Sequence, residues 1–245
     1  MASLLSIDGL TYHYPGAAQP VFQNISLDVQ HGEFVAVVGG SGVGKSTLLR
    51  CVGGLINAQS GGIHWHSQAN ADSRQHGIVF QDGRLMPWRN LRDNIAYGMQ
   101  GLALDDHQKQ ERIADVLELT RLAHLAERWP HQLSGGQVQR GGIARALAVH
   151  PDLLLMDEPF SAVDAITREH LQDELSAIME RIGAAVVFIT HDIEEAVYLA
   201  DRVVVLAGSP AGLALEVQVK DHLSGKRDRQ DPALQALAQQ IAQAL

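Results

Sequence analysis

The feature that most constrains the fold is a glycine-rich loop set between an apolar run and a helix-like segment. The run EFVAVVG, which ends at Gly39, has the texture of a buried strand, and STLLRCVGG follows the loop. The loop satisfies the pattern G-x-x-x-x-G-K-[ST] with Gly39, Gly44, Lys45 and Ser46. Glycines let backbone N–H groups curl around phosphates, the lysine adds a positive charge, and the serine hydroxyl can ligate Mg²⁺. The sequence therefore predicts a phosphate-binding loop between a strand and a helix.

Apolar runs alternate with helical segments along most of the chain, which predicts an α/β fold with a parallel sheet. A texture change at about Asp82 indicates a mainly helical insertion, in which DDHQKQERIADVLELT is an amphipathic helix candidate. The expected strands are NISLDVQ, EFVAVVG, GIHWH, GIVFQ, DLLLMDE, AAVVFITH and RVVVLAG. The other expected helices are ITREHLQDELSAIMERI, DIEEAVYLA and the tail DPALQALAQQIAQAL.

Composition excludes several classes of protein. With 46% hydrophobic residues among 245, the chain can bury a packed core, and its single cysteine, Cys51, rules out an internal disulfide. A formal net charge of −9 argues against broad binding to nucleic acid or anionic lipid. The N-terminus has no secretory pattern, and the longest apolar runs fall far short of the roughly 18 to 20 residues that span a bilayer. We expect any membrane role to come through a partner.

Two carboxylates stand at the end of the buried run LLLMDEP. Open α/β sheets bind ligands at the carboxyl ends of their strands, so Asp157 can hold Mg²⁺, directly or through water. Glu158 is then placed to polarise or orient an attacking water, because phosphoryl transfer depends on positioning and electrostatics. Such a pair alone is usually a solvated loop; together with the phosphate loop it indicates phosphoryl-transfer chemistry.

Two further polar residues follow strands. His191 comes after AAVVFIT and directly before a capped helix start at Asp192, so it can hydrogen-bond a γ-phosphate or water, or be one of twelve histidines with a structural role. Gln81, at the end of GIVF, is either an ordinary polar strand end or a residue that reaches Mg²⁺ and water. The residues alone leave both alternatives open.

A second glycine-rich stretch, LSGGQVQRGGIARAL, runs from Leu133 to Leu147. A turn rich in Gly and Ser that enters a helix can hold a phosphate at the helix N-terminus. Gly141 and Gly142 fall inside the expected helix, where each costs about 1 kcal/mol relative to alanine. Close packing against a neighbouring backbone would compensate for that cost.

The ordered set GGSGVGKST, Gln81, LSGGQ, LLLMDEP, SAVD and His191 resembles the ATP-binding subunit of an ABC transporter over nearly the whole chain. The resemblance implies a P-loop NTPase (RecA-like) core, a mainly helical subdomain and a small antiparallel β subdomain. It implies one ABC ATPase domain over 1–245, with the RecA-like and β parts at about 1–81 and 150–220, the helical subdomain at about 82–149 and a C-terminal helix at about 230–245. In SAVD, Val163 stands where leucine is more usual.

The resemblance also implies ATP and Mg²⁺ as ligands and assigns roles to residues. Glu158, His191 and Gln81 are the expected catalytic residues, and Ser46, Gln81 and Asp157 the expected metal ligands. Either Tyr14 or, as the second choice, Tyr12 stacks on adenine. The remaining nucleotide contacts are expected from Gly39, Gly40, Ser41, Gly42, Val43, Gly44, Lys45, Ser46, Thr47, Ser134, Gly135, Gly136 and Gln137.

Members of this family pack two ATP-binding subunits head to tail. The resemblance therefore implies that Ser134, Gly135, Gly136 and Gln137 of one copy face the γ-phosphate of ATP held by the Lys45 loop of the other. ATP would join the two copies by sharing its phosphate charge between a cationic loop and a helix N-terminus. This arrangement would explain why one chain carries two glycine-rich stretches.

The segment DGRLMPWRNLRDNIAYGM contains the apolar residues Leu85, Met86 and Trp88, which are either contacts for a partner helix or part of the helical core. Its LMPW resembles importers of nitrate, sulfonates and taurine, as do DEPFSAVDAITREHLQDEL and FITHDIEEAVYLADRVVVL. That resemblance implies a peripheral ATPase subunit on the cytoplasmic face of the inner membrane. Its expected partners are a second copy, permease subunits and an extracytoplasmic solute-binding protein, with no nucleic acid.

Two alternatives remain at this stage. One is a soluble ABC-type ATPase acting on nucleic acid or ribosomes, a class that tends to show two nucleotide-binding halves, long coiled coils, zinc-binding cysteines or basic arms. The other is an ABC-type ATPase that regulates a membrane protein without transport. The identity of the partner separates the second alternative from an importer.

Overall fold

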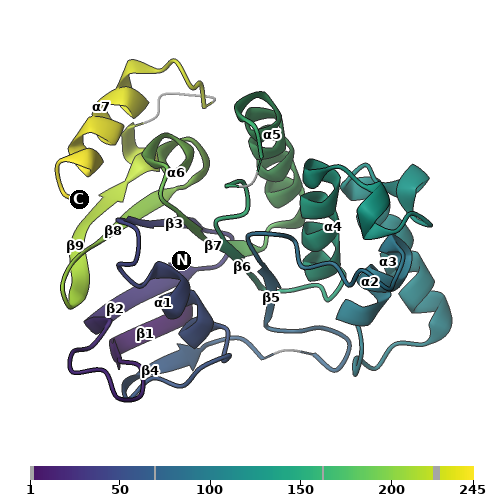
Figure 1. Cartoon of the computed structure of the whole chain (residues 1–245), viewed down its shortest axis with the longest axis horizontal. Helices are drawn as coiled ribbons and strands as arrows, with labels where there is room; N and C mark the ends of the chain where they lie inside the picture. Colours follow the sequence, from purple (N-terminus) through teal and green to yellow (C-terminus); the bar gives the residue numbers. More distant parts are fainter. Residues whose placement is uncertain (1–2, 69, 162, 223–226) are drawn as a thin grey trace. The chain divides into compact units, whose positions relative to one another are not determined.

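A computed structural model describes residues 3–68, 70–161, 163–222 and 227–245 (Figure 1). The chain divides into two compact units by its internal contacts. The first unit comprises the described residues of 1–67 and 185–245, and the second unit comprises those of 68–184. Across the described ranges, no helix combines the length and the apolar character needed to span a bilayer.

The first unit is built on strands in the order β4-β1-β2-β9-β8-β3-β7. Strand β3 pairs in parallel with β7 and β8, whereas β1 pairs antiparallel with β2 and β4, and β8 antiparallel with β9. The strand bounds are β1 Ser3–Tyr12, β2 Phe22–Gln30, β3 Phe34–Gly39, β4 Ser60–Trp65, β7 Ala185–Thr190, β8 Arg202–Gly208 and β9 Ala211–Gln218.

The helices of the first unit are α1 Lys45–Val52, α6 Ile193–Leu199, the short η3 Val219–His222 and α7 Pro232–Ala242. Every residue of β3 and β7 is buried, which is typical of parallel strands covered on both faces. Helix α7 packs against α6 (Figure 1). Since α1 begins directly after the glycine-rich loop, the parallel core places that loop at the carboxyl end of β3.

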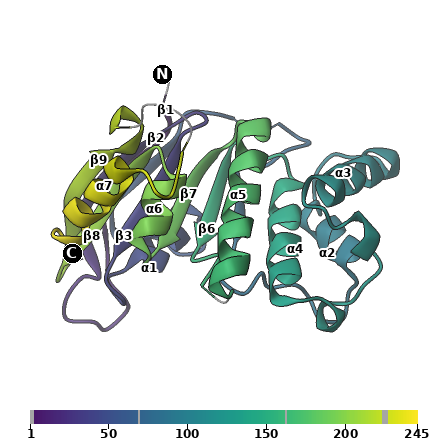
Figure 2. The same cartoon turned by 90° about the horizontal axis from the view of Figure 1, so that it is seen from above.

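The second unit holds a short parallel pair, β5 His76–Val79 and β6 Leu153–Asp157. Its helices are α2 Leu91–Gly98, α3 Asp106–Leu119, α4 Gly135–Leu147 and α5 Ala165–Ile182, with short turns η1 Ala123–Leu125 and η2 Pro130–Gln132. Helices α4 and α5 lie side by side (Figures 1 and 2). Local signals set the helix ends: Asp105 and Gln108 form a capping box at α3, and Gly183 ends α5 with φ 72°.

The architecture confirms the predicted fold class: a parallel α/β core, a helical insertion after Asp82 and an antiparallel β portion. Two strands, β1 and β9, were not predicted. In β1 the alternation of buried and exposed residues is broken, because Leu4 and Leu5 are both buried and the pairing register shifts near Gly9. Strand β9 begins with Ala-Gly and buries few of its side chains, so it lacks the apolar pattern of a core strand.

Candidate functional site

The glycine-rich loop of the first unit depends on its glycines for backbone conformation. Gly42 and Gly44 have φ values of 78° and 110°, in the left-handed region that favours glycine. A Cβ at Gly44 would lie 2.6 Å from Val21 Cγ1, and one at Gly39 would lie 2.6 Å from the Leu206 carbonyl oxygen. Larger residues are therefore excluded at both ends of the loop.

The lysine of the loop is turned inward. Lys45 is buried, and its Nζ donates to the carbonyl oxygens of Gly39 at 2.8 Å and Gly40 at 3.1 Å. Gly40, Ser41 and Gly42 are exposed around this ammonium group. The loop thus offers open backbone and a held positive charge at the start of α1, which is the chemistry that a polyphosphate requires.

The structure distinguishes the two tyrosines near the loop. Tyr12 is buried and packs against Phe22, whereas Tyr14 is 45% exposed. The Tyr14 hydroxyl lies 3.1 Å from Thr47 Oγ1, on the helix that follows the loop, and the Tyr12 ring meets the Tyr14 ring edge-on. Only Tyr14 of this pair has an exposed ring beside the phosphate loop.

His191 lies at the same end of the sheet as the phosphate loop. Strands β3 and β7 are parallel neighbours in which Val38 pairs with Thr190, so Gly39 and His191 both follow at the carboxyl edge. Thr190 Oγ1 accepts from the Asp192 backbone N–H and donates to the buried Glu195 carboxylate. Asp192 caps α6, so the turn that carries the exposed His191 is held on both sides.

In the second unit, Gln81 and the carboxylates share a strand edge. Strands β5 and β6 are parallel with Val79 opposite Met156, so Gln81 and Asp157 both stand at their carboxyl ends. Asp157 is buried and Gln81 exposed. Glu158 has a φ of 45°, a conformation that costs an L-residue about 1–2 kcal/mol and that clusters at functional sites.

The turn after Glu158 leads into helix α5. Ser161 Oγ donates to the Glu158 carbonyl oxygen at 2.9 Å, and the Asp164 side chain accepts from the Thr167 N–H at the start of α5. Hydrogen bonds from Thr167 lower the pKa of Asp164. Of the predicted SAVD segment, Ala162 lies outside the described residues.

The second glycine-rich stretch forms the N-terminus of α4. Ser134 Oγ accepts from the Gln137 N–H at 3.3 Å, and Gln137 Oε1 accepts from the Ser134 N–H at 2.8 Å, which makes a capping box. A Cβ at Gly135 would meet no other described atom within 4 Å, whereas one at Gly136 would contact Thr167 at 3.4 Å. The helix N-terminus therefore presents an open surface at Gly135.

Close packing explains the two glycines inside helix α4, as we expected. A Cβ at Gly142 would lie 2.9 Å from the Gly83 carbonyl oxygen. At Gly141 it would lie 2.8 Å from Leu91 Cδ1 and 3.1 Å from Leu85 Cδ1. The approach of α4 to its neighbours compensates for the unfavourable helix propensity of both residues.

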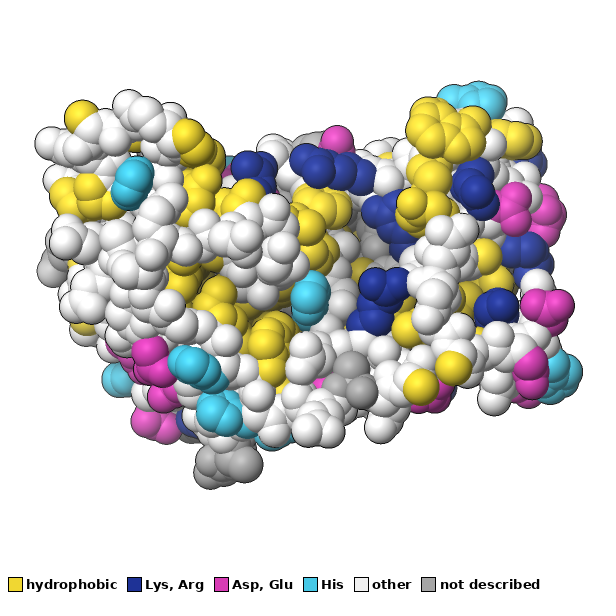
Figure 3. Space-filling model, turned by 90° about the horizontal axis from the view of Figure 1, so that it is seen from below, with side chains coloured by type: hydrophobic (Ala, Val, Ile, Leu, Met, Phe, Trp, Pro, Cys, Tyr) yellow, Lys and Arg dark blue, Asp and Glu magenta, His cyan; other side chains and the backbone are white. Residues whose placement is uncertain are grey.

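The residues of the predicted partner segment differ in burial, so some belong to the helical core and one is available to a partner. Leu85 is buried against α4 and Met86 is half-buried, but Trp88 is 70% exposed. Tyr97 and Trp129 are further exposed aromatic residues of the second unit. Figure 3 shows one face of the molecule on which hydrophobic and basic side chains are interspersed. Of the three predicted contacts, Trp88 alone is largely available to a partner.

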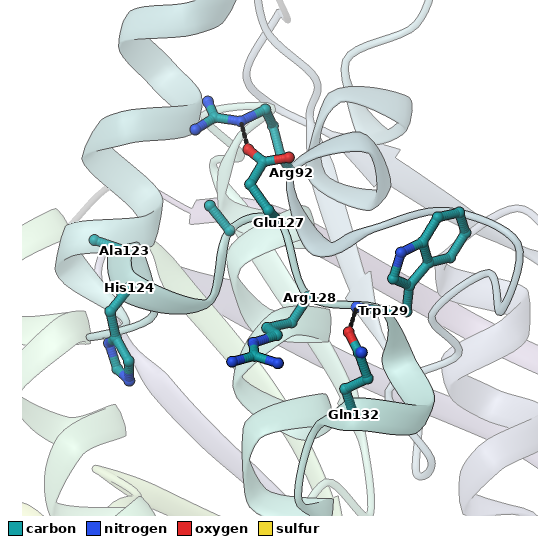
Figure 4. Close-up of a pocket in the computed structure, with 8 residues that line it drawn as sticks. Arg92, Ala123, His124, Glu127, Arg128, Trp129 and Gln132 are labelled. Atoms are coloured by element: carbon teal, nitrogen blue, oxygen red, sulfur yellow. Dashed lines mark hydrogen bonds and ion pairs between the residues drawn. The ribbon is translucent and has the colours of Figure 1, made fainter.

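A polar hollow in the second unit is lined by Arg92 of α2 and by residues of the segment 123–132, which precedes α4 (Figure 4). Arg92 Nε pairs with Glu127 at 2.8 Å, and the Trp129 backbone N–H donates to Gln132 Oε1 at 3.0 Å. This second bond closes the turn η2, which ends two residues before Ser134. None of these residues belongs to a phosphate-binding pattern in the sequence.

Comparison with known proteins agrees with this architecture. Residues 22–161 match the protein family described as ABC transporter. The taurine import ATP-binding protein TauB of Pseudomonas syringae pv. tomato is 40% identical over 218 residues, covering 89% of this chain and 84% of that protein. The aliphatic sulfonates import ATP-binding protein SsuB of Bacillus subtilis is 37% identical over 242 residues, covering 98% of this chain and 93% of that protein.

A solved structure of a dimeric ATP-binding cassette, in a post-hydrolysis state bound to ADP and Pi, superposes with a TM-score of 0.73. It is 29% identical, and the match covers 88% of this chain and 98% of that one. The family match spans more than half of the chain, and both relatives align over most of it. This chain belongs to the ABC transporter family, whose ATP-binding subunits bind and hydrolyse ATP.

Proposed function

We propose that the chain is the ATP-hydrolysing subunit of a bacterial ABC importer for a small organic or oxyanion solute of the nitrate, sulfonate or taurine kind. The observation that carries the proposal is a pair of open phosphate-binding features, one in each unit. These are the loop around Lys45 and the N-terminus of α4 at Gly135. ATP-driven closure of a head-to-tail dimer would join the first feature of one copy to the second feature of the other.

The proposed organisation is one ABC ATPase domain over 1–245. Within it, the RecA-like and β parts take about 1–81 and 150–220, the helical subdomain about 82–149 and the C-terminal helix about 230–245. The positions of α2, α3 and α4 between β5 and β6 support this division.

The loop from Gly39 to Thr47 would hold the β- and γ-phosphates through backbone N–H groups and Lys45, and Tyr14 would stack on adenine. The exposure of Tyr14 beside Thr47, against the burial of Tyr12, supports this choice. From the second copy, Ser134, Gly135, Gly136 and Gln137 would reach the γ-phosphate.

The residues proposed as metal ligands fit Mg²⁺. Ser46, Gln81 and Asp157 supply a hydroxyl, an amide and a carboxylate oxygen, and Mg²⁺ prefers such hard oxygen donors. The buried Asp157 carboxylate at the end of β6 supports this role. When bound, the ion would neutralise charge on the phosphate oxygens.

The protein's own residues would then act on water and phosphate. Glu158 would accept a hydrogen bond from the attacking water and orient it, and the strained backbone at this residue supports a functional role. His191 would hydrogen-bond the γ-phosphate from the edge that it shares with the phosphate loop. Gln81, two residues after the end of β5, would contact Mg²⁺ and water.

Transport requires partners that the chain itself does not supply. We place the subunit at the cytoplasmic face of the inner membrane, beneath permease subunits, with an extracytoplasmic solute-binding protein selecting the solute. The exposed Trp88 is the proposed contact with a permease helix. The net charge of −9 supports a partner other than nucleic acid.

The experiment that tests the proposal captures Glu158→Gln protein from its native membranes with ATP and Mg²⁺ and identifies what accompanies it by mass spectrometry. The variant should keep ATP binding, lose hydrolysis by about 10²–10⁴-fold and accumulate as a closed dimer. Glu118→Gln, an exposed change on α3, serves as the control and should hydrolyse ATP normally. Co-purified permease and solute-binding proteins would support the importer, whereas only soluble or ribosomal partners would overturn it.

A further inference from the structure

We propose that Arg145 is a positioning residue for Gln81. In this arrangement the Arg145 side chain fastens the loop after Gln81 to helix α4, so that the direction of Gln81 depends on the helix that begins at Ser134. The inference rests on the catalytic role proposed above for Gln81. All of the residues involved belong to the second unit.

Arg145 binds the loop through two adjacent carbonyl groups. Its Nη1 donates to the Arg84 carbonyl oxygen at 2.7 Å and its Nη2 to the Gly83 carbonyl oxygen at 2.8 Å. The planar guanidinium suits two parallel bonds of this kind, which a lysine ammonium cannot reproduce with the same geometry. Partial burial lowers the pKa of Arg145 and Asp82 acts in the opposite direction, and the half-buried cation lies against backbone oxygens.

The two carbonyls belong to residues with left-handed backbone. Gly83 has a φ of 66° and Arg84 a φ of 42°. This conformation is ordinary for glycine but strained for arginine, and it persists only where the surroundings hold it. Arg145 binds the loop at this bend, two and three residues after Gln81.

Other contacts hold the loop on both sides of Gln81. Gln139 Nε2 donates to the Phe80 carbonyl oxygen at 3.3 Å, just before Gln81. After it, a Cβ at Gly83 would lie 2.8 Å from the Val138 carbonyl oxygen, and a Cβ at Gly142 would lie 2.9 Å from the Gly83 carbonyl oxygen. Gln81 itself is exposed between these anchors. These contacts fasten the loop to α4 on both sides of Gln81, and the two Arg145 hydrogen bonds are shorter than the one from Gln139.

The test is a double-mutant cycle on ATP hydrolysis that uses Arg145→Lys, Gln81→Ala and the combination. Arg145→Lys should lower kcat about tenfold in the natural background and less than about twofold when Gln81 is already alanine. The melting temperature should fall equally in both backgrounds, because it reports folding alone. Arg92→Lys, which alters a half-buried arginine paired with Glu127 in the same unit, should leave kcat unchanged.

Two results would overturn the inference, and they are distinguishable. An equal fold-loss of kcat in both backgrounds would mean that Arg145 supports the fold without acting through Gln81. Normal hydrolysis by Gln81→Ala would remove the proposed role of Gln81, and the inference with it.

A second variant keeps the test decisive if Arg145→Lys fails to fold. Gly142→Ala leaves Arg145 intact but pushes a methyl group against the Gly83 carbonyl oxygen. Its kcat defect should likewise disappear in the Gln81→Ala background, and persistence of the full defect would contradict the inference.

Discussion

The two glycine-rich stretches of this chain use glycine for different physical reasons. In the phosphate loop, Gly42 and Gly44 adopt left-handed φ values that other residues avoid. In α4, Gly141 and Gly142 are helical and buried, and a Cβ would lie 2.8 Å from a leucine side chain at Gly141 and 2.9 Å from the Gly83 backbone at Gly142. One stretch uses glycine for backbone conformation and the other for proximity.

Glycine can also serve to keep a surface open. Gly40 and Gly135 are exposed, and a Cβ at either would meet no other described atom within 4 Å. Both lie where we propose that phosphate oxygens approach. Alanine substitutions can therefore separate conformation, proximity and access. We expect the largest effect where conformation and proximity act together, followed by proximity alone, conformation alone and access.

The largest effect should come from Gly44→Ala, because alanine disfavours the positive φ at this position and its methyl group would also clash with Val21. A left-handed alanine costs about 1–2 kcal/mol, and the clash with Val21 adds about 1–3 kcal/mol. We expect the free energy of unfolding to fall by roughly 3 kcal/mol in urea titrations, with ATP binding lost. A loss below about 1 kcal/mol would contradict the assignment of both constraints to this residue.

The next largest effect should come from Gly142→Ala, because its added methyl group comes too close to the Gly83 backbone while its φ is ordinary for a helix. Overpacking against the Gly83 backbone costs about 1–3 kcal/mol, and improved helix propensity returns about 1 kcal/mol. Gly141→Ala is the matched control, because it meets the ends of two leucine side chains that can shift. Urea unfolding should show Gly142→Ala destabilised by about 1 kcal/mol and Gly141→Ala close to the natural chain. Equal losses would remove the distinction between backbone and side-chain contacts.

Gly42→Ala tests conformation without proximity. Its φ of 78° penalises alanine by about 1–2 kcal/mol, while the reduced entropy of the unfolded chain offsets about 0.4–1 kcal/mol. Unfolding measurements should give a net loss of less than about 1 kcal/mol. A loss as large as that of Gly44→Ala would show that φ dominates at both positions and that the Val21 contact is irrelevant.

The smallest effect on stability, with the opposite sign, is expected for Gly135→Ala. At an exposed helical position alanine stabilises α4 by up to about 1 kcal/mol. If this surface must approach a phosphate, the more stable variant should nevertheless hydrolyse ATP more slowly. A thermal melt and a steady-state ATPase assay on the same preparation check both expectations, and an unchanged rate would argue against the proposed access to this surface.

Local pattern predicted the parts of the fold that depend on short-range chemistry. The apolar run before Gly39 is β3, the loop leads into α1, and Asp192 caps the expected helix that is α6. Each depends on neighbours in the sequence: glycine for left-handed φ, a side-chain oxygen for a helix start, apolar periodicity for a buried face.

Other features depend on contacts that the sequence does not bring together. The pattern could not choose between Tyr12 and Tyr14, because their exposure is set by packing against Phe22 and α1. The sequence also did not assign Leu85 and Trp88 to the core or the surface. In the structure Leu85 is buried and Trp88 is exposed. Strands β1 and β9 were missed because their stability comes from pairing with strands distant in sequence rather than from a clean alternation.

The sequence by itself thus determined the class of fold, the order of the phosphate-binding patterns and the strands and helices that carry them. Tertiary structure alone decided why Gly142 is tolerated inside α4 and why the loop after Gln81 holds its left-handed bend. Both follow from the approach of α4 to Gly83 and from the bonds of Arg145. The physical reason is range. Backbone φ preferences and helix caps act within a few residues, whereas close packing and the hydrogen bonds of Arg145 join residues some sixty positions apart.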